Sequence, residues 1–203
     1  FKAGTDGYYK VSDYMTNLFE QNENESRGLN YSYNEAGYIW KYLGVDNATA
    51  RVASENDQNY LVYRLADVYL MKAEALIMQD NYEMAGELID KTRQRAGLEK
   101  MTLSEDRLTM LEYLLVERQK EFFAEGKNWF DMLRIGLRSQ QLSDVRYKNL
   151  FIEQALKAVA ATSQSLGRAT LSNEGSWYMP FSESELQKNP LLVQSEYYES
   201  ISN

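Results

Sequence analysis

Three glutamates, Glu117, Glu121 and Glu125, recur at four-residue intervals in a stretch that also holds bases and large aromatic residues. On a helix this spacing places the carboxylates on one face, neighbours about 5–6 Å apart. Two carboxylates roughly 5 Å apart are also the working pair of a retaining glycosidase. Glycosidase carboxylates approach the sugar from opposite walls of a cleft, however, whereas neighbours on one helix point the same way. The spacing therefore favours an ion-pair corner, with catalysis as the alternative.

Oppositely charged and aromatic residues surround these glutamates. The cations that can pair with them and with Asp131 are Arg118, Lys120, Lys127 and Arg134. The aromatic residues expected to form the adjoining core are Phe122, Phe123, Trp129 and Phe130. Because semi-buried charges are tolerated when they are paired and hydrogen-bonded, we interpret the segment as a structural contact between two helices. Ligand recognition is then expected elsewhere in the chain.

The composition excludes several other chemistries. A formal charge of -8 argues against nucleic acid, because phosphate contacts need clustered Lys and Arg. The chain has no histidine, hence no imidazole base and no ordinary transition-metal site. It has no cysteine, which excludes thiol catalysis and disulfides. We expect no cofactor.

Two polar stretches, NENES (22–26) and ENDQN (55–59), offer oxygen ligands of the kind that calcium takes. Neither has the D-x-D-x-D-G order of a calcium loop, so no metal site is predicted. No run of eighteen apolar residues is present, and no membrane span is predicted. The chain opens with FKAGTDGYYK, without an initiator Met or an apolar leader, and we expect it to be a segment of something longer.

Composition changes twice along the chain. Residues 1–59 are rich in Tyr, Asn, Gly and Ser and predict loops, with a short helix at 11–19 and an extended segment near 38–42. Residues 60–136 predict a helical hairpin followed by a helical corner. Residues 137–203 predict a helix within 147–167, an exposed loop at 168–176 and an extended C-terminal segment with one turn capped by Ser182.

The hairpin is predicted from apolar periodicity. Its first helix, within 60–79, has apolar residues at Leu61, Leu65, Val68, Ala75 and Leu76, widened by Leu70, Met71 and Ile77. The second, within 82–97, should turn Ala85, Leu88, Ile89 and Thr92 inward and end with Gly97 at the C′ position. A third helix is expected to start from a capping box at Thr102 and Glu105, to bury Leu108, Leu111, Leu115 and Phe122, and to end at Gly126.

Ala73 and Ala85 lie twelve residues apart, the spacing at which tetratricopeptide repeats place small residues between their two helices. Small residues at these positions let the helix axes approach closely. The sequence contains no second clear repeat of 34 residues. The fold predicted from these patterns is mostly α, with tetratricopeptide-like helical hairpins and long irregular loops.

Four motifs resemble the C-terminal half of the SusD/RagB family of outer-membrane nutrient-binding proteins. They are RLADVYLMKAEAL (64–76), IDKTRQRAGL (89–98), ERQKEFFAEGKNWFDMLRIG (117–136) and MPFSESELQKNPLLVQSEYY (179–198). Their order and rough spacing agree with the family from about residue 60 to residue 198. Some positions depart from the pattern, with Leu65 in place of a Tyr and Asn128 in place of an Arg. These departures leave the predicted fold unchanged, and they bear on which ligand this member binds.

The resemblance implies a SusD-like helical fold and a role in nutrient uptake. Members of this family are lipid-anchored on the extracellular face of the outer membrane, through a cysteine at the mature N-terminus that this chain does not contain. They bind a glycan or other nutrient and deliver it to a SusC-like TonB-dependent transporter. The implied function is non-catalytic capture of an oligosaccharide.

Non-catalytic sugar sites offer aromatic faces to apolar C–H patches, and amides, acids or Arg to hydroxyls. Residues 1–59 have this composition. The candidate platforms are Tyr31, Tyr33, Tyr38 and Trp40, and the candidate hydroxyl partners are Arg27, Asn34 and Glu35. For each aromatic residue a place in the core is the alternative, most of all for Trp40 in the segment IWKY.

Two other functions stay open from the sequence. A tetratricopeptide-type scaffold would bind a protein partner through a groove lined with Lys, Arg and Asn. The clearest hairpin here is unrepeated and acidic, which lowers this option. A carboxylate glycosidase would need two acids facing each other across an open cleft, one of them with a pKa raised by burial.

Overall fold

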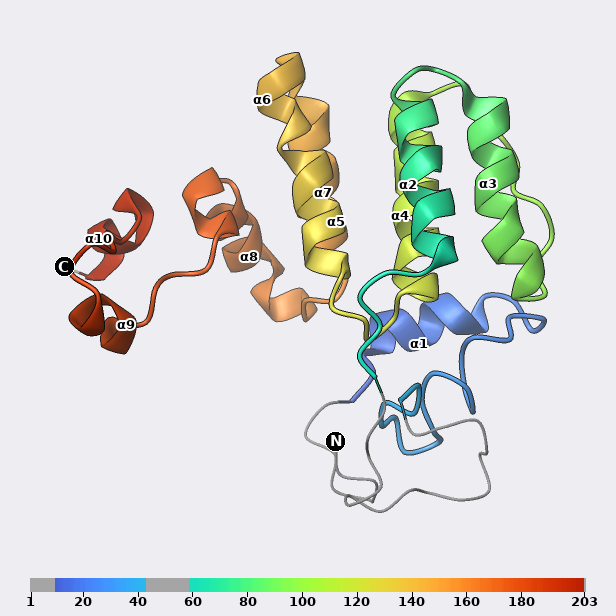
Figure 1. Cartoon of the computed structure of the whole chain (residues 1–203), viewed down its shortest axis with the longest axis horizontal. Helices are drawn as coiled ribbons and strands as arrows, with labels where there is room; N and C mark the ends of the chain where they lie inside the picture. Colours follow the sequence, from blue (N-terminus) through green and yellow to red (C-terminus); the bar gives the residue numbers. More distant parts are fainter. Residues whose placement is uncertain (1–9, 43–58, 203) are drawn as a thin grey trace. The chain divides into compact units, whose positions relative to one another are not determined.

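A computed structural model of the chain describes residues 10–42 and 59–202 and is mostly helical (Figure 1). Within these residues the β-structure is limited to isolated bridges, Lys10 with Tyr38, Leu29 with Tyr33 and Tyr33 with Ile39. The predicted helical fold is therefore confirmed, while the extended segment expected near 38–42 is reduced to two such bridges. The polar stretch 55–59 lies outside the described residues except for Asn59. The chain divides into two compact units, Phe1–Ile135 and Gly136–Asn203, and each is described by itself.

The first unit is built on three packed helices. They are α2 (Leu65–Ile77), α3 (Tyr82–Arg95) and α4 (Arg107–Glu121), and each packs against the other two. The short helix α1 (Asp13–Glu20) contacts α4, and Figure 1 shows it crossing below the ends of the three. Ala73 and Ala85, the two small residues twelve apart, are both fully buried. The core residues that the three helices share include Leu70, Ile77, Ile89, Met110, Leu111, Leu114 and Leu115.

The buried face of α2 differs from the predicted stripe. Leu61, Leu65 and Val68, expected to face inward, are exposed, and residues 61–63 precede the helix. Leu70 and Ile77, which were also expected inward, are buried as predicted, and the rest of the buried face consists of Asp67, Ala73 and Glu74. Two of these are acids, and each is paired with cations of other elements. A prediction that counted only apolar residues could not find a buried face that contains paired carboxylates.

The ends of the helices follow local rules in part. Gly97 has φ +84°, and a Cβ there would lie 2.4 Å from the backbone oxygen of Asn24, so the predicted C′ glycine after α3 is confirmed. The capping box predicted at Thr102 is wrong. Asp106 caps α4 instead, and its carboxylate accepts from the Thr109 backbone N–H at 2.8 Å. The helix ends at Glu121, five residues before Gly126, where the chain turns through Ala124 and Gly126 with positive φ.

Helix α5 (Asn128–Gly136) follows this turn, and the second unit begins at its last residue. The buried core of the second unit includes Phe151 and Trp177, whose ring centroids lie 4.4 Å apart. The segment expected as one helix within 147–167 forms parts of two, and residues 168–171 are helical rather than loop. Ser182 caps the turn before Pro190 as predicted. The helical elements of this unit after α5 are α6 (Arg138–Leu142), α7 (Val145–Leu156), η2 (Ala161–Ser163), α8 (Gln164–Leu171), η3 (Glu174–Trp177), α9 (Glu183–Lys188) and α10 (Glu196–Ser202).

Among the described helices, none combines the length and the apolar character needed to cross a bilayer.

Candidate functional site

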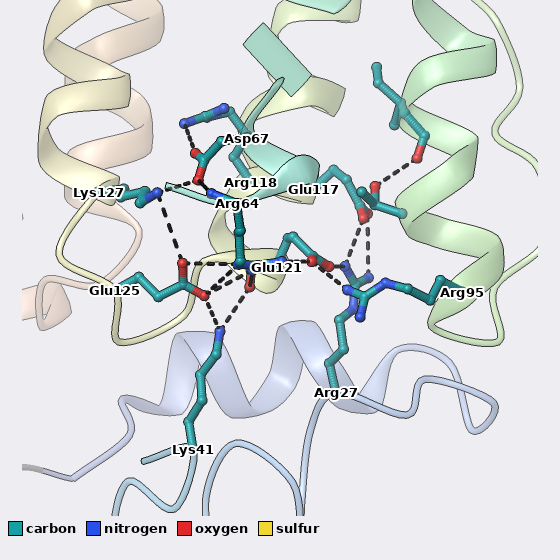
Figure 2. A network of polar contacts seen from close by, with 12 residues as sticks. Arg27, Lys41, Arg64, Asp67, Arg95, Glu117, Arg118, Glu121, Glu125 and Lys127 are labelled. Atoms are coloured by element: carbon teal, nitrogen blue, oxygen red, sulfur yellow. Dashed lines mark hydrogen bonds and ion pairs between the residues drawn. The ribbon is translucent and has the colours of Figure 1, made fainter. Parts of the chain in front are cut away.

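The three glutamates of the opening motif lie at the C-terminal end of α4, where segments distant in the sequence meet (Figure 2). Glu117 and Glu121 belong to the last turns of α4, and Glu125 lies in the turn that follows. All three are at most 2% exposed. Every one of them is paired with at least one cation. We call this group and its cations the carboxylate cluster.

Glu121 receives three arginines. Arg27 donates from Nη1 to Glu121 Oε2 at 3.0 Å, and Arg64 and Arg95 both donate to Oε1. Arg27 also bridges to Glu117, from Nη1 to Oε1 at 2.7 Å. Arg27 comes from the segment after α1, Arg64 directly precedes α2, and Arg95 ends α3. One carboxylate of α4 therefore joins three separate parts of the first unit.

Glu125 connects two further residues, Lys41 and Lys127, to the carboxylate cluster. Lys41 Nζ donates to Glu125 Oε1 at 2.6 Å and to the Glu121 carbonyl oxygen at 2.9 Å. Arg64 Nη2 donates to Glu125 Oε1 at 2.9 Å. Lys127 Nζ lies 4.0 Å from Glu125 Oε2 and also pairs with Asp67 of α2. In Figure 2 Lys41 and Arg27 reach the cluster from the side opposite α2.

A second group of ions adjoins the cluster around the ring of Phe122. Arg118 donates from Nε to Asp131 Oδ2 at 2.7 Å, and its Nη2 lies 3.5 Å from Asp67 Oδ1. The cationic groups of Arg64, Arg118 and Lys127 lie 4.7, 4.7 and 4.8 Å from the centroid of the Phe122 ring. Cations at this distance are attracted by the negative face of the ring. Phe122 thus helps to stabilise the positive charges that its neighbouring acids neutralise.

Burial and pairing act in opposite directions on the pKa values of the cluster. Burial alone would raise the pKa of Glu121, but the hydrogen bond and charge of Arg64, with the charges of Arg95 and Arg27, hold it below its ordinary value. Burial lowers the pKa of Lys41, and its contacts with Glu125 oppose this effect. A general acid needs a raised carboxyl pKa, so the shift of Glu121 is opposite to what acid catalysis requires.

The interpretation of this motif as an ion-pair corner agrees with the structure, and three of its four cations pair with an acid that it named: Arg118, Lys127 and Arg134. Lys120 pairs with Glu25, at 3.3 Å, rather than with a glutamate of α4. Arg118 and Arg134 both pair with Asp131, as the sequence allowed. Four further members of these ion pairs were not predicted from the sequence: Arg64, Arg95, Lys41 and Asp67. Among these four residues, local spacing links only Arg64 and Asp67. Asp67 lies three residues after Arg64, and its Oδ2 accepts a hydrogen bond from the Arg64 backbone N–H at 3.3 Å.

The aromatic core expected beside the cluster is also smaller than predicted. Phe122 is buried, but Phe130 is 65% exposed. Phe123 packs edge-on against Phe19 of α1, with centroids 5.9 Å apart, and against Tyr33 at 6.4 Å. The ring of Phe123 therefore joins the segment after α4 to the aromatic segment, residues 31–40.

The four candidate aromatic platforms lie in different environments. Tyr31 is 64% exposed, whereas Tyr33 is 3% exposed and packs on Phe19. Tyr38 is half-buried, with Lys10 Nζ 4.9 Å above its ring. Trp40 is half-buried, and its Nε1 is buried without a hydrogen-bond partner among the described residues. The structure thus presents Tyr31 openly, Tyr38 and Trp40 in part, and Tyr33 as a core residue.

The three candidate hydroxyl partners also separate. Arg27 is held by Glu25, Glu117 and Glu121. Burial alone would lower the pKa of Arg27, but its hydrogen bonds and charge contacts with Glu25 and Glu117 raise it above the ordinary value. Asn34 forms a turn, because its Oδ1 accepts from the Tyr38 backbone N–H at 2.9 Å. Glu35 is exposed in that turn. The structure therefore gives Arg27 and Asn34 internal partners and leaves Glu35 open to solvent.

Among the described residues, no group of three or more acidic side chains is arranged to hold a metal ion.

Comparison with known proteins finds a matching family model and similar proteins. The model of the SusD family matches residues 2–198. Two SusD-like proteins of Formosa agariphila are each 28% identical to the chain, over 144 residues (62% of the chain) and 171 residues (83% of the chain). In both cases the match covers 28% of the relative's own length.

A crystal structure of a SusD superfamily protein from Bacteroides fragilis has a similar fold. It superposes with a TM-score of 0.60 at 21% identity, covering 94% of this chain and 41% of that one. At this identity the similarity concerns the fold alone. The chain thus spans well under half the length of the relatives to which it is similar.

Proposed function

Because the chain belongs to the SusD family, we propose that the protein captures a nutrient, an oligosaccharide in particular, at the cell surface without altering it chemically. It delivers this ligand to a SusC-like TonB-dependent transporter. It is held on the extracellular face of the outer membrane by an N-terminal lipid anchor of the full-length protein. The family match and the exposed aromatic ring of Tyr31 support the binding role.

The buried and paired state of Glu117, Glu121 and Glu125 carries the non-catalytic part of the proposal. A glycosidase needs one carboxyl that can give up a proton and another that reaches the anomeric carbon. Each of these three acids instead neutralises arginine or lysine side chains inside the fold. Their role is to hold the elements together, and recognition falls to the aromatic segment.

Calorimetric titration of the full-length protein with a panel of oligosaccharides tests the proposal. We expect binding in the micromolar to millimolar range, with no release of reducing ends. Tyr31→Ala should weaken binding about tenfold, which corresponds to roughly 1.4 kcal/mol for one lost stacking face. Tyr113→Ala, which removes another exposed tyrosine from α4, should leave binding unchanged.

Two results contradict the proposal. One is the absence of binding to every oligosaccharide of the panel. The other is release of reducing ends that Glu121→Gln abolishes in a folded variant, since this would assign hydrolysis to the carboxylate cluster. We also expect the full-length protein to co-purify with the proposed outer-membrane transporter.

A further inference from the structure

A cavity of about 310 Å³ opens between the segment before α2, α2 itself and the start of α5. Its volume lies at the lower end of the roughly 300–1,000 Å³ typical of small-ligand pockets. We call it the side pocket. None of the described residues 31–40 lines it, so it is separate from the aromatic segment. The lining residues used below are Val62, Tyr63, Met71, Arg118, Phe130 and Asp131.

The side pocket has a charged lining residue with an unused hydrogen-bond donor. Arg118 is 4% exposed, and its Nε and Nη2 face Asp131 and Asp67. Its Nη1 is buried and has no hydrogen-bond partner among the described residues. A buried donor without a partner costs free energy, and nearly all such groups in folded proteins find a partner. Arg118 is among the residues that line the cavity, and an oxygen acceptor that reached Nη1 from there would supply that partner.

The charges around the cavity indicate a neutral ligand. Three acids and three bases line it, and they pair with one another or with cations of the carboxylate cluster. Because these charges already balance one another, an added anion or cation would bring a charge without an unpaired counter-charge. A hydroxyl group fits this lining better, because it can accept from Arg118 and donate to a free lone pair of a carboxylate such as Asp131.

The other lining residues are apolar and open to solvent. Tyr63 is 75% exposed, Phe130 65%, Val62 60% and Met71 45%. Two aromatic rings beside a hydrogen-bonding lining are the combination that binds a sugar ring, whose C–H face packs on the aromatic face. Phe130 was predicted to be a core residue, and its exposure contradicts that prediction.

We propose that the side pocket is a second binding site, for a single neutral sugar ring that accepts a hydrogen bond from Arg118 and packs on Phe130 and Tyr63. This inference rests on the proposed capture of oligosaccharides and adds a site outside residues 31–40. A saccharide that binds both the aromatic segment and the side pocket would contact the protein at two points along its length. The side pocket alone takes one ring and binds it more weakly than the whole protein binds the oligosaccharide.

Methionine-methyl NMR on the full-length protein tests the site, because the Met71 methyl reports on the cavity. The probes are the methyl glycosides of glucose, galactose and mannose, with acetate, methylammonium and N-acetylleucinamide as charged and peptide-like comparisons. We expect at least one glycoside to shift the Met71 signal in a saturable way, while the exposed Met84 of α3 stays unchanged. Phe130→Ala should weaken this binding about tenfold. Phe181→Ala, at another exposed phenylalanine, and Tyr31→Ala should not.

Because Phe130 is exposed, its truncation should leave the fold intact, which circular dichroism checks. A Met71 signal that responds to no glycoside overturns the proposal. A response to acetate, methylammonium or N-acetylleucinamide alone also overturns it, the last indicating that the pocket accepts a polypeptide. Oligosaccharide binding that depends on Tyr31 while Met71 stays silent rejects the side pocket and leaves the proposed function standing. Failure of every oligosaccharide to bind in calorimetry rejects the proposed function itself.

Discussion

Glu121 shows how a buried carboxylate can organise a fold. It accepts from three arginines that lie 94, 57 and 26 residues away in the sequence. Such a group adds little net stability compared with a well-packed apolar residue, because desolvation offsets most of the attraction between the charges. Removing one partner is different, since the remaining charges stay buried without compensation. The expected contribution of Glu121 is therefore to fix which segments meet.

Replacing Glu121 by Gln should lower the free energy of unfolding by about 3–5 kcal/mol, the range for breaking a buried ion pair. The reason is that Arg27, Arg64 and Arg95 would lose a shared negative charge. Urea denaturation followed by circular dichroism measures the change. Glu153→Gln is the matched control, because its pair with Arg168 is about half exposed on both sides and should matter little. Equal losses in the two variants would contradict the special place of Glu121.

Stability should also fall in acid through the paired carboxylates. Burial alone would raise the pKa of Glu25, but the hydrogen bond and charge of Arg27 and the charge of Lys120 lower it in the folded state. A lowered folded pKa contributes stability that is present above the ordinary value of 4.5 and is lost as the pH falls through the folded value. Glu25→Gln should therefore flatten the loss of unfolding free energy below about pH 5. Glu87→Gln, at an exposed site of α3, should keep the slope of the unsubstituted protein.

At the scale of elements, two helix-end features that depend only on neighbouring residues were predicted correctly from the sequence. Gly97 and Ser182 act within a few residues of themselves, and both were found from local spacing. The start of α4 was not, because two acidic or hydroxyl residues, Thr102 and Asp106, are both acceptable caps by type. On the buried face of α2, Leu70 and Ile77 were predicted, but Asp67 and Glu74 were missed because their burial depends on cations elsewhere in the chain. Pairing over such distances leaves no periodic signal in a single chain.

The position of the cap can be tested directly. Asp106→Ala should lower the free energy of unfolding by about 1 kcal/mol, because the Thr109 backbone N–H loses its acceptor. Thr102→Ala should change it by a few tenths of a kcal/mol at most, the usual effect of an exposed substitution. Thermal or urea unfolding of both variants measures the difference. A larger effect at Thr102 would contradict the cap at Asp106 and support the helix start at Thr102 that was predicted from the sequence.

At the scale of the whole molecule, the loop-rich N-terminal part is fastened to the helices by ions and aromatic rings. Arg27 and Lys41 bind acids at the end of α4, and Tyr33 packs on Phe19 and Phe123. The residues that could present a ligand surface, Tyr31 and Trp40, lie between these fastening points. Sequence composition predicts this segment as the candidate ligand surface, but it could not say which aromatic rings face solvent, because their burial depends on α1 and on the turn after α4.

This fastening predicts that Lys41 controls the order of the aromatic segment. Lys41→Met keeps much of the side-chain length and removes the contacts to Glu125 and to the Glu121 carbonyl oxygen. Hydrogen exchange at the Tyr38 and Trp40 amides should then become about tenfold faster, which corresponds to roughly 1.4 kcal/mol of lost local stability. The amides of α2 and α3 should keep their rates, because their core contacts are untouched. The control is Lys148→Met, whose side chain is 22% exposed and paired with Glu174, against 20% for Lys41. If the control variant loosens residues 38–40 to the same extent, or if Lys41→Met leaves them protected, the segment is held by its aromatic packing and not by the ion pair.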